Sequence, residues 1–170
     1  DAGWDAWVEE RKAIPVPGAL ALTRAAADRG VTVFYISNRR ADSAEATLEN
    51  LRRQGFPVQH GDVFLGLGTQ VPGCEQAGSG KTCRRQLVGR GHRVLMQFGD
   101  QLGDFVQAPA NTPAQHEALH AEYRDWFGQR WWVLPNPTYG AWEPAQFDNA
   151  WSLPRSERRT RKREALRTDR

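Results

Sequence analysis

The alternation of helix-forming stretches with short apolar runs constrains the fold of this chain more than any other feature of its sequence. Residues 18–29 are rich in helix formers, and Gly30 follows them with the conformational freedom that a left-handed helix end requires. Residues 31–36 form a continuous β-branched and aromatic run, which is long enough for a strand buried on both faces and too short for a helix. This order predicts a helix followed directly by a strand.

The same alternation continues through most of the chain. Asp42 and Glu45 have the spacing of a capping box and predict the start of a helix that ends at Gly55. Thr112 predicts the start of another helix, which ends at Gly128. The remaining predicted elements are a helix at 82–89 and strands at 63–67, 94–98 and 131–134.

Helices and strands that alternate in this way predict an α/β fold, with a parallel sheet that carries helices on both faces and is joined by right-handed crossovers. In such a sheet the carboxyl ends of the strands meet at one edge, and ligands bind there. The residues that follow the predicted strands are therefore the first candidates for a functional site.

The size and charge of the chain predict one compact domain and a short basic tail. The chain has 170 residues, of which 39% are hydrophobic and 25% charged, a normal balance for a globular domain. Residues 1–154 form the predicted domain and carry a net charge of −2, whereas residues 155–170 carry +5. Because the domain itself is not basic, we expect no nucleic acid as a partner. The tail has two open interpretations, a solvated terminal helix or a segment that contacts nucleic acid or anionic lipid.

Cys74 and Cys83 flank a glycine-rich loop and lie nine positions apart. Two interpretations are open, a disulfide bond and two separate thiols, because the compartment of the protein decides between them. Two cysteines are too few for a four-cysteine zinc site. No run reaches the roughly 18 apolar residues that a membrane-spanning helix needs, and no basic stretch with an apolar run opens the printed sequence.

Polar and charged side chains lie where two of the predicted strands end. Ser37 follows the first strand, Asp100 and Asp104 follow the third, and Lys81 lies between them in the sequence. A hydroxyl, an ammonium group and two carboxylates at one sheet edge suit a phosphate and a magnesium ion, because Mg²⁺ takes hard oxygen ligands and keeps several of them for substrate and water.

Four segments of the sequence resemble the bacterial class C acid phosphatases, which are exported lipoprotein 5′-nucleotidases of the haloacid dehalogenase (HAD) superfamily. The resemblance runs from about Trp4 to Trp151 and follows the order and spacing of that family. The segments that carry it are Ser37-Asn38-Arg39, residues 81–85, residues 99–105 and residues 134–143. The resemblance implies a HAD-like, Rossmann-type parallel sheet.

The resemblance also implies roles for individual residues. Ser37 is expected to hold the phosphoryl oxygens and Lys81 to neutralise them, so these two are the expected catalytic residues. Asp100 is expected to bind Mg²⁺, with Asp104 supporting the metal site. Two further neighbours of Ser37, namely Asn38 and Arg39, are expected to bind the substrate.

The expected substrate is a small phosphomonoester, in particular a nucleoside 5′-monophosphate. Related enzymes hold the base between aromatic rings, so Tyr139 and one of Trp4 or Trp7 are candidates for stacking, with core packing as the alternative for each. The resemblance implies a location in the periplasm, at the outer membrane or at the cell surface. A membrane is expected as a partner only through an N-terminal lipid anchor outside the printed sequence.

The sequence departs from the resemblance at the nucleophile. The superfamily uses two aspartates of an Asp-x-Asp-x-Thr motif on its first, central strand, and the 170 residues contain no such motif. Asp1 and Asp5 follow no predicted strand and are too far apart in sequence to take these roles. We therefore expect an N-terminally incomplete domain that lacks the central strand, with weak or no turnover through an aspartyl-phosphate. A non-catalytic phosphate-binding remnant is an alternative.

A second alternative is a zinc hydrolase, because His116-Glu117-Ala118-Leu119-His120 matches the His-Glu-x-x-His pattern of helical zinc sites. Glu143 is the candidate third ligand in this interpretation. The competing interpretation is a partly solvated helix face, and the resemblance implies that this helix lies on the outside of the sheet, away from the phosphate edge.

Overall fold

The computed structural model describes residues 2–75 and 78–166, so Asp1 of the predicted domain and residues 167–170 of the predicted tail lie outside the described residues. The chain divides into two compact units, residues 1–91 and residues 92–170. Each unit contains one pair of parallel strands. The predicted boundary at residue 154 stays a prediction.

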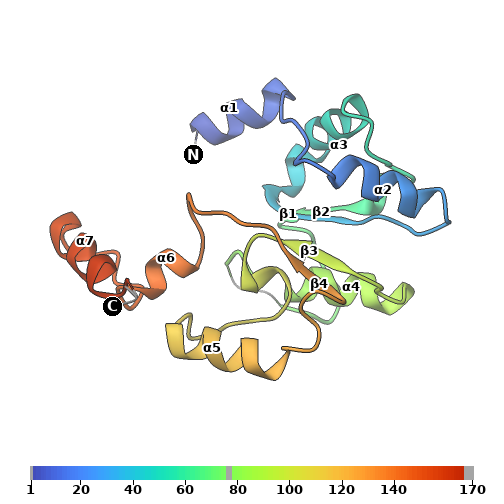
Figure 1. The fold of residues 1–170 in the computed structure, drawn as a ribbon. Helices are drawn as coiled ribbons and strands as arrows, with labels where there is room; N and C mark the ends of the chain where they lie inside the picture. The colour runs from blue at the N-terminus through green and yellow to red at the C-terminus, as the bar shows by residue number, and fades with distance from the viewer. Residues whose placement is uncertain (1, 76–77, 167–170) are drawn as a thin grey trace. The chain divides into compact units, whose positions relative to one another are not determined.

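The first unit combines its strand pair with four α-helices among the described residues. Strands β1 (Tyr35–Arg40) and β2 (Phe64–Leu67) pair in parallel and lie side by side in Figure 1. The helices are α1 (Ala2–Glu10), α2 (Ala19–Ala27), α3 (Ala44–Arg53) and α4 (Thr82–Gly91), and the short 3-10 turns are η1 (Ala41–Ser43) and η2 (Gly61–Val63). Leu48 of α3 packs with the buried Val63 and Phe64, which fixes α3 against β2.

Strand β1 begins later than the apolar run at 31–36 predicts and continues through the polar segment that follows it. The Gln59 side-chain amide explains the late start, because it accepts from the Val33 N–H at 3.2 Å and donates to the Val31 carbonyl at 2.9 Å. These contacts satisfy the backbone of the run with a side chain in place of a neighbouring strand.

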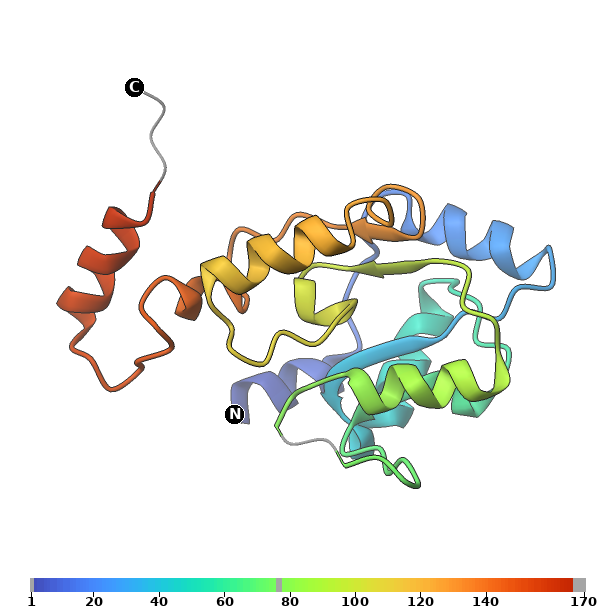
Figure 2. The ribbon, with the colours of Figure 1, turned by 90° about the horizontal axis from the view of Figure 1, so that it is seen from below.

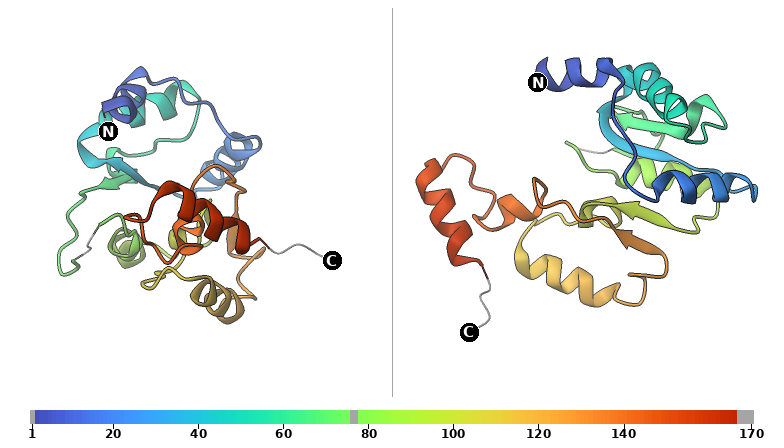
Figure 3. Two further views of the ribbon diagram at one scale, coloured as in Figure 1. Left: turned by 90° about the vertical axis from the view of Figure 1, so that its left-hand side faces the viewer. Right: turned by 45° about the horizontal axis from the view of Figure 1, so that its top comes forward.

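The second unit holds the other strand pair, β3 (Gln97–Gly99) and β4 (Trp131–Val133), which lie side by side in the right-hand view of Figure 3. Trp131 and Phe105 are both 4% exposed, and their rings stack with centroids 5.4 Å apart. The remaining elements are η3 (Leu102–Asp104), α5 (Pro113–Glu122), α6 (Trp142–Ala145) and α7 (Arg155–Glu164).

The prediction that strand 94–98 is buried is wrong. The strand is three residues long, and Val94, Met96 and Phe98 are 49%, 53% and 44% exposed. Within the part of the chain that the structure describes, β3 pairs with β4 alone, so neighbouring strands cover the run on one side only.

The helix predicted from Thr112 to Gly128 is shorter than expected. Its start is confirmed, since the Thr112 hydroxyl accepts from the Gln115 N–H at 3.2 Å. It ends at Glu122, because the Trp126 carbonyl accepts from the N–H groups of Arg130 and Trp131 in a tight turn toward β4.

The capping box predicted for Asp42 and Glu45 is also wrong, although the helix α3 is present. The Asp42 carboxylate accepts from the Arg40 guanidinium at 2.6 Å, and no side-chain capping bond forms at the helix start. This ion pair holds the pKa of Asp42 below its ordinary value. An exposed arginine two positions away thus competes for the carboxylate that the capping box would need.

The predicted parallel pairing is confirmed, while the single continuous sheet is not observed. The described residues form two separate two-stranded sheets, β1 with β2 and β3 with β4. The alternation in the sequence correctly indicates the type of strand pairing, but it carries no information on how many strands share one sheet.

The basic tail forms helix α7, which follows α6 through a short loop (Figure 2) and has no buried residue. Three of its basic side chains contact neighbours in the second unit. Arg161 pairs with Asp148 at 3.1 Å, Lys162 pairs with Glu143 at 2.7 Å, and the Arg158 guanidinium lies 5.2 Å from the centre of the Trp151 ring. None of the helices in the described ranges is long and apolar enough to cross a bilayer.

Candidate active site

The segment Ser37-Asn38-Arg39 lies in an irregular part of β1. Ile36 is opposite Leu65 and Arg40 is opposite Leu67, so β1 has extra residues between these two pairs. The Ser37 hydroxyl accepts from the Arg39 N–H at 3.1 Å. Such bulges re-aim side chains and are common beside active sites. The predicted phosphate-binding segment therefore belongs to a distorted strand and does not form a separate turn.

Gly66 on β2 allows the two strands to come close at this bulge. A Cβ atom at this position would lie 2.8 Å from the backbone of Ala41 and 2.8 Å from the Arg39 carbonyl oxygen. A larger residue would therefore push β2 away from the bulge.

Arg84 on α4 links this bulge to the loop that carries Lys81. Its side chain is 4% exposed. The guanidinium donates to the Ser37 carbonyl, to the Asn38 amide oxygen at 2.7 Å and to the Gly80 carbonyl at 2.8 Å. Hydrogen bonds from a buried cation are among the stronger ones in proteins. One side chain thus holds the two predicted phosphate-binding segments of the first unit together.

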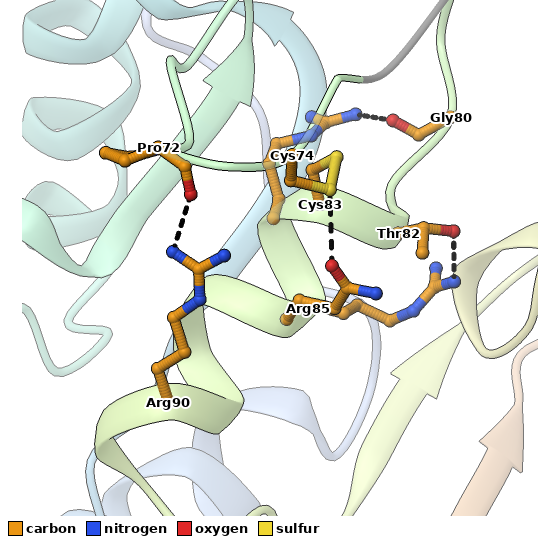
Figure 4. The surroundings of a disulfide bond; sticks show 9 residues. Pro72, Cys74, Gly80, Thr82, Cys83, Arg85 and Arg90 are labelled. Carbon is orange, nitrogen blue, oxygen red and sulfur yellow. Dashed lines mark hydrogen bonds between the residues drawn. A yellow bond between two sulfur atoms is a disulfide. The ribbon is translucent and has the colours of Figure 1, made fainter.

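The open question about the cysteines is answered by a disulfide bond between Cys74 and Cys83, whose Cα atoms are 5.6 Å apart. Figure 4 shows the bond between the glycine-rich loop and the start of α4, close to Gly80 and Thr82. Lys81 immediately precedes α4, and its carbonyl accepts from the Arg85 N–H at 3.0 Å. The disulfide therefore restrains the loop from which Lys81 projects.

Arg39 has an aromatic partner in the first unit. Its guanidinium lies 4.9 Å from the centre of the Trp7 ring, and partial burial lowers the pKa of Arg39 from its ordinary value. Trp7 also contacts Trp4, with ring centroids 5.1 Å apart. Of the two tryptophans considered for base stacking, Trp7 thus has one face engaged by a cation.

In the second unit, Asp100 is the first residue after β3, and its carboxylate accepts from the Asn136 side-chain amide at 2.6 Å. Asn136 follows β4 in the chain, and the Leu134 N–H donates to the Gly99 carbonyl at 2.8 Å. The parallel register thus brings the residues after β3 and β4 together at one edge of this strand pair.

Asp104 shapes the Asp100 loop from within. Its Oδ2 atom accepts from the N–H groups of Asp100 at 2.9 Å and Gln101 at 3.1 Å. Gly99 leaves room for this contact, because a Cβ atom there would clash with the Asp104 side chain. The carboxylate therefore fixes the backbone that carries Asp100. The predicted support of the metal site by Asp104 stays a prediction. These bonds show how Asp104 could support the site, since they hold the backbone of Asp100 in place.

Gln101 ties the same loop to the segment after β4. Its side-chain carbonyl accepts from the Ala141 N–H at 2.9 Å. Tyr139 lies in that segment with 57% of its surface exposed. Its predicted stacking on a nucleobase stays a prediction, and core packing does not describe it.

A cavity of about 240 Å³ opens beside Asp100. Asp100 and Gln101 form one part of its wall, His116 and His120 of α5 form another, and most of the remaining lining is apolar. The expectation that the His-Glu-x-x-His helix lies away from the phosphate edge is therefore wrong. Helix α5 thus brings both imidazoles to the cavity that Asp100 also lines.

The contacts of these side chains differ from those of a zinc site. His116 Nε2 lies 3.0 Å from the Asn111 amide oxygen, and partial burial lowers the pKa of His116. The His120 ring contacts Phe127 at a centroid distance of 5.0 Å. Glu143, the candidate third ligand, is paired with Lys162. Among residues 2–75 and 78–166, no three His, Cys, Asp or Glu side chains are grouped to hold a metal ion.

Asp100 does fit the needs of a magnesium ion. Asn136 engages one carboxylate oxygen and leaves the other for a metal, and the backbone around Asp100 is held by Asp104. Mg²⁺ is usually bound through one or two protein carboxylates together with water and substrate oxygens.

Residues 1–142 match the family described as HAD superfamily, subfamily IIIB (Acid phosphatase). The chain belongs to this family. By family and by structural resemblance it is an acid phosphatase, a hydrolase of phosphomonoesters. The family assignment made from the four sequence segments is thus confirmed.

Two solved structures of the class C acid phosphatase from Bacillus anthracis resemble the chain closely. One is 28% identical with a TM-score of 0.84, covering 99% of this chain and 68% of that chain. The other, which has tungstate bound, is 29% identical with a TM-score of 0.84 and covers 98% and 68% respectively. This likeness confirms an α/β fold with parallel strands, as in HAD-like phosphatases.

The predicted site residues of this acid phosphatase thus fall into two sets. The first unit brings Ser37 and Asn38 together with the loop before α4, and the second unit brings Asp100 together with Asp104. The sequence interpretation missed two residues, Arg84 and Asn136. Both lie inside the segments that carry the family resemblance, but the site residues that they contact, Asn38 and Asp100, are 46 and 36 positions away in the chain.

Proposed function

We propose that this acid phosphatase hydrolyses nucleoside 5′-monophosphates with the help of Mg²⁺. The observation that carries the proposal is the Asp100 carboxylate at the carboxyl end of β3, where Asn136 binds one of its oxygens and Asp104 fixes its backbone. A carboxylate held in this way at a strand end suits a hard cation better than a role in packing.

The first unit supplies the groups for the phosphoryl oxygens. Ser37 offers a hydroxyl and Lys81 an ammonium group, and Asn38 and Arg39 are the proposed neighbours of the substrate. The tungstate-bound relative supports this proposal, because tungstate is an oxyanion with the tetrahedral shape of phosphate. Arg84 acts indirectly by holding the Ser37 carbonyl and the Gly80 carbonyl.

When bound, Mg²⁺ would offset negative charge on the transferring phosphoryl group. Asp100 would hold it through the carboxylate oxygen that does not accept from Asn136. Asp104 would keep the N–H groups of Asp100 and Gln101 in place, so that the Asp100 side chain does not need to reorganise.

The covalent steps require two aspartates that the 170 residues do not contain in an Asp-x-Asp-x-Thr arrangement. We propose that a central strand outside the printed sequence carries them. One carboxylate attacks phosphorus and the P–O bond to the alcohol breaks, while the other gives a proton to the departing oxygen. Water, activated by the second aspartate, then hydrolyses the aspartyl-phosphate and releases inorganic phosphate.

The nucleotide preference and the location of the enzyme are part of the proposal. The exposed ring of Tyr139 would stack on the base. The Cys74–Cys83 disulfide supports an oxidising compartment, such as the periplasm or the cell surface, because such bonds persist there. Membrane attachment would require a lipid anchor outside the printed sequence.

The test joins a strand that bears Asp-x-Asp-x-Thr to the 170-residue chain and measures phosphate release from a nucleoside 5′-monophosphate with and without Mg²⁺. We expect turnover by the joined chain and weak or no turnover by the 170 residues alone. Asp100→Asn should lower kcat by about 10²- to 10³-fold, because it removes the charge that binds the metal. Asp62→Asn, at an exposed position in η2, is the control.

Three outcomes would change this conclusion. Full activity of Asp100→Asn would refute the proposed metal ligand. Equal rates with glycerol phosphate and a nucleoside 5′-monophosphate would refute the nucleotide preference. Binding of nucleotide without turnover, even at high concentrations of the joined chain, would favour a non-catalytic phosphate-binding remnant.

A further inference from the structure

We infer that Asn136 is a positioning residue that sets which oxygen of Asp100 faces a metal ion, and that Thr138 fixes the orientation of the Asn136 amide. The inference rests on the proposed function, because it takes Asp100 as a metal ligand. It extends the contact between Asn136 and Asp100 to Thr138 and to the strength of metal binding.

The Asn136 amide has a defined orientation. Its carbonyl oxygen accepts from the Thr138 N–H at 3.1 Å and from the Thr138 hydroxyl at 2.6 Å. Since the Thr138 N–H can only donate and the Asp100 carboxylate can only accept, the amide oxygen must face Thr138 and the amide nitrogen must face Asp100. The amide nitrogen then donates to Asp100 Oδ2 at 2.6 Å.

The local sequence restricts the backbone of the segment at 135–138. Pro135 and Pro137 flank Asn136, and each proline fixes its own φ and restricts the residue before it to extended conformations. The bond from the Thr138 N–H to the Asn136 side chain closes an Asx turn over the second proline. The segment at 135–138 can therefore present the Asn136 amide with little loss of conformational freedom.

The register of β3 and β4 places the segment at 135–138 next to Asp100. Gly99 is opposite Val133 in the parallel pair, and the Leu134 N–H donates to the Gly99 carbonyl. Asp100 and Asn136 therefore emerge from adjacent strand ends on the same edge. Asn136 is partly buried there, whereas Thr138 is exposed, so Thr138 acts through Asn136 and does not itself approach the carboxylate.

The consequence for metal binding follows from the chemistry of a carboxylate. With one oxygen engaged by a neutral donor, Asp100 keeps its full negative charge and presents its other oxygen to a cation. A donor of this kind also holds the side chain in one rotamer, so less freedom is lost when a cation binds. Groups that orient a metal ligand in this way typically change metal affinity by about 10- to 100-fold when removed.

The test uses the 170-residue chain and Mn²⁺ alone, with paramagnetic broadening of backbone N–H signals from residues 99–101 as the readout. We expect Asp100→Asn to abolish the broadening and Asn136→Ala to raise the midpoint Mn²⁺ concentration by about 10-fold or more. Thr138→Val, which removes only the hydroxyl, should raise it by about 3-fold. Thr138→Ser keeps the hydroxyl and should show the same midpoint Mn²⁺ concentration as the wild type.

The outcomes separate this inference from the proposed function. If Asp100→Asn abolishes broadening while Asn136→Ala and Thr138→Val stay within twofold of the wild type, the positioning role is refuted and the metal site stands. If Asp100→Asn leaves broadening unchanged, both the metal site and the positioning role are refuted. Equal midpoints for Thr138→Val and Thr138→Ser would refute the role of the hydroxyl even if Asn136→Ala behaves as expected.

Discussion

The two sets of site residues are organised in different ways. In the first unit, one buried guanidinium, that of Arg84, holds the bulge of β1 and the loop before α4. In the second unit, the Asp100 loop is held by separate hydrogen bonds of three side chains, those of Asp104, Gln101 and Asn136. The proposed phosphate-binding set thus depends on one central cation, whereas the proposed metal-binding set is supported by neutral amides and one carboxylate.

This difference predicts how each region responds to a single substitution. A region with one central group should lose much of its stability in one step, because several part-buried carbonyl oxygens lose their donor together. A region with distributed support should lose less per substitution. Substitution of Arg84, reduction of the disulfide and substitution of Asp104 test this contrast.

Arg84→Met should lower the free energy of unfolding by at least about 3 kcal/mol, because each hydrogen bond from a charged group contributes about 1.5–3 kcal/mol. Urea unfolding followed by tryptophan fluorescence measures the change. Arg90→Met is the matched control on the same helix, since Arg90 makes one exposed bond to the Pro72 carbonyl. A loss of less than about 1 kcal/mol for Arg84→Met would contradict the central role of this cation.

Reduction of the Cys74–Cys83 bond should destabilise the chain by about 2–3 kcal/mol, as expected for a disulfide that closes a short loop. Unfolding of the oxidised and reduced chain, with Cys74→Ser/Cys83→Ser as the second variant, gives this value. The reduced chain should also bind inorganic phosphate more weakly, because the loop with Lys81 becomes freer. Unchanged phosphate affinity on reduction would show that the bond does not organise this loop.

Asp104→Ala should lower the free energy of unfolding by about 1–2 kcal/mol, because the N–H groups of Asp100 and Gln101 lose their acceptor. Asp125→Ala, at an exposed position of the same unit, serves as the control. A loss as large as that of Arg84→Met would refute the contrast between central and distributed support.

The pH dependence of His116 gives the smallest expected effect. Burial lowers the pKa of His116, so the folded state favours the neutral imidazole, while the unfolded chain takes up a proton near pH 6.5. Stability from this group is therefore present above about pH 6.5 and is lost as the pH falls further. The loss should stay below about 0.5 kcal/mol, because more than half of the group is solvated.

Unfolding at pH 7.5 and pH 5.5 measures this dependence. His116→Gln should flatten it, because the substitution removes the titrating imidazole. A steeper pH dependence in His116→Gln than in the wild type would contradict the direction of the pKa shift.

Much of the fold could be predicted because its signals are local. The Thr112 cap, the end of α2 near Gly30 and the strand at 63–67 depend on residues close together in the sequence, and the structure confirms them. The errors have distant causes. Gln59 displaces the start of β1, and β3 is exposed because it pairs with β4 alone among the described residues.

The candidate site was predictable to the same degree. The sequence selects Ser37, Lys81, Asp100 and Asp104 as candidates, because they carry recognisable chemistry in recognisable segments, and their roles stay predictions. Arg84 and Asn136 act through partners that only the fold brings near, and an arginine on a helix usually faces solvent. The Asx turn of Asn136 is visible in the sequence, but its target, Asp100, follows from the strand register.

The most direct test of the phosphatase site is a crystal structure of the chain grown with tungstate and Mn²⁺, using anomalous diffraction to locate both heavy elements. We predict a tungsten peak within contact distance of the Ser37 hydroxyl and the Lys81 ammonium group, and a manganese peak at the Asp100 carboxylate. Tungsten bound away from Ser37 and Lys81 would contradict the proposed phosphate site, and manganese bound at His116 and His120 would contradict the proposed metal site.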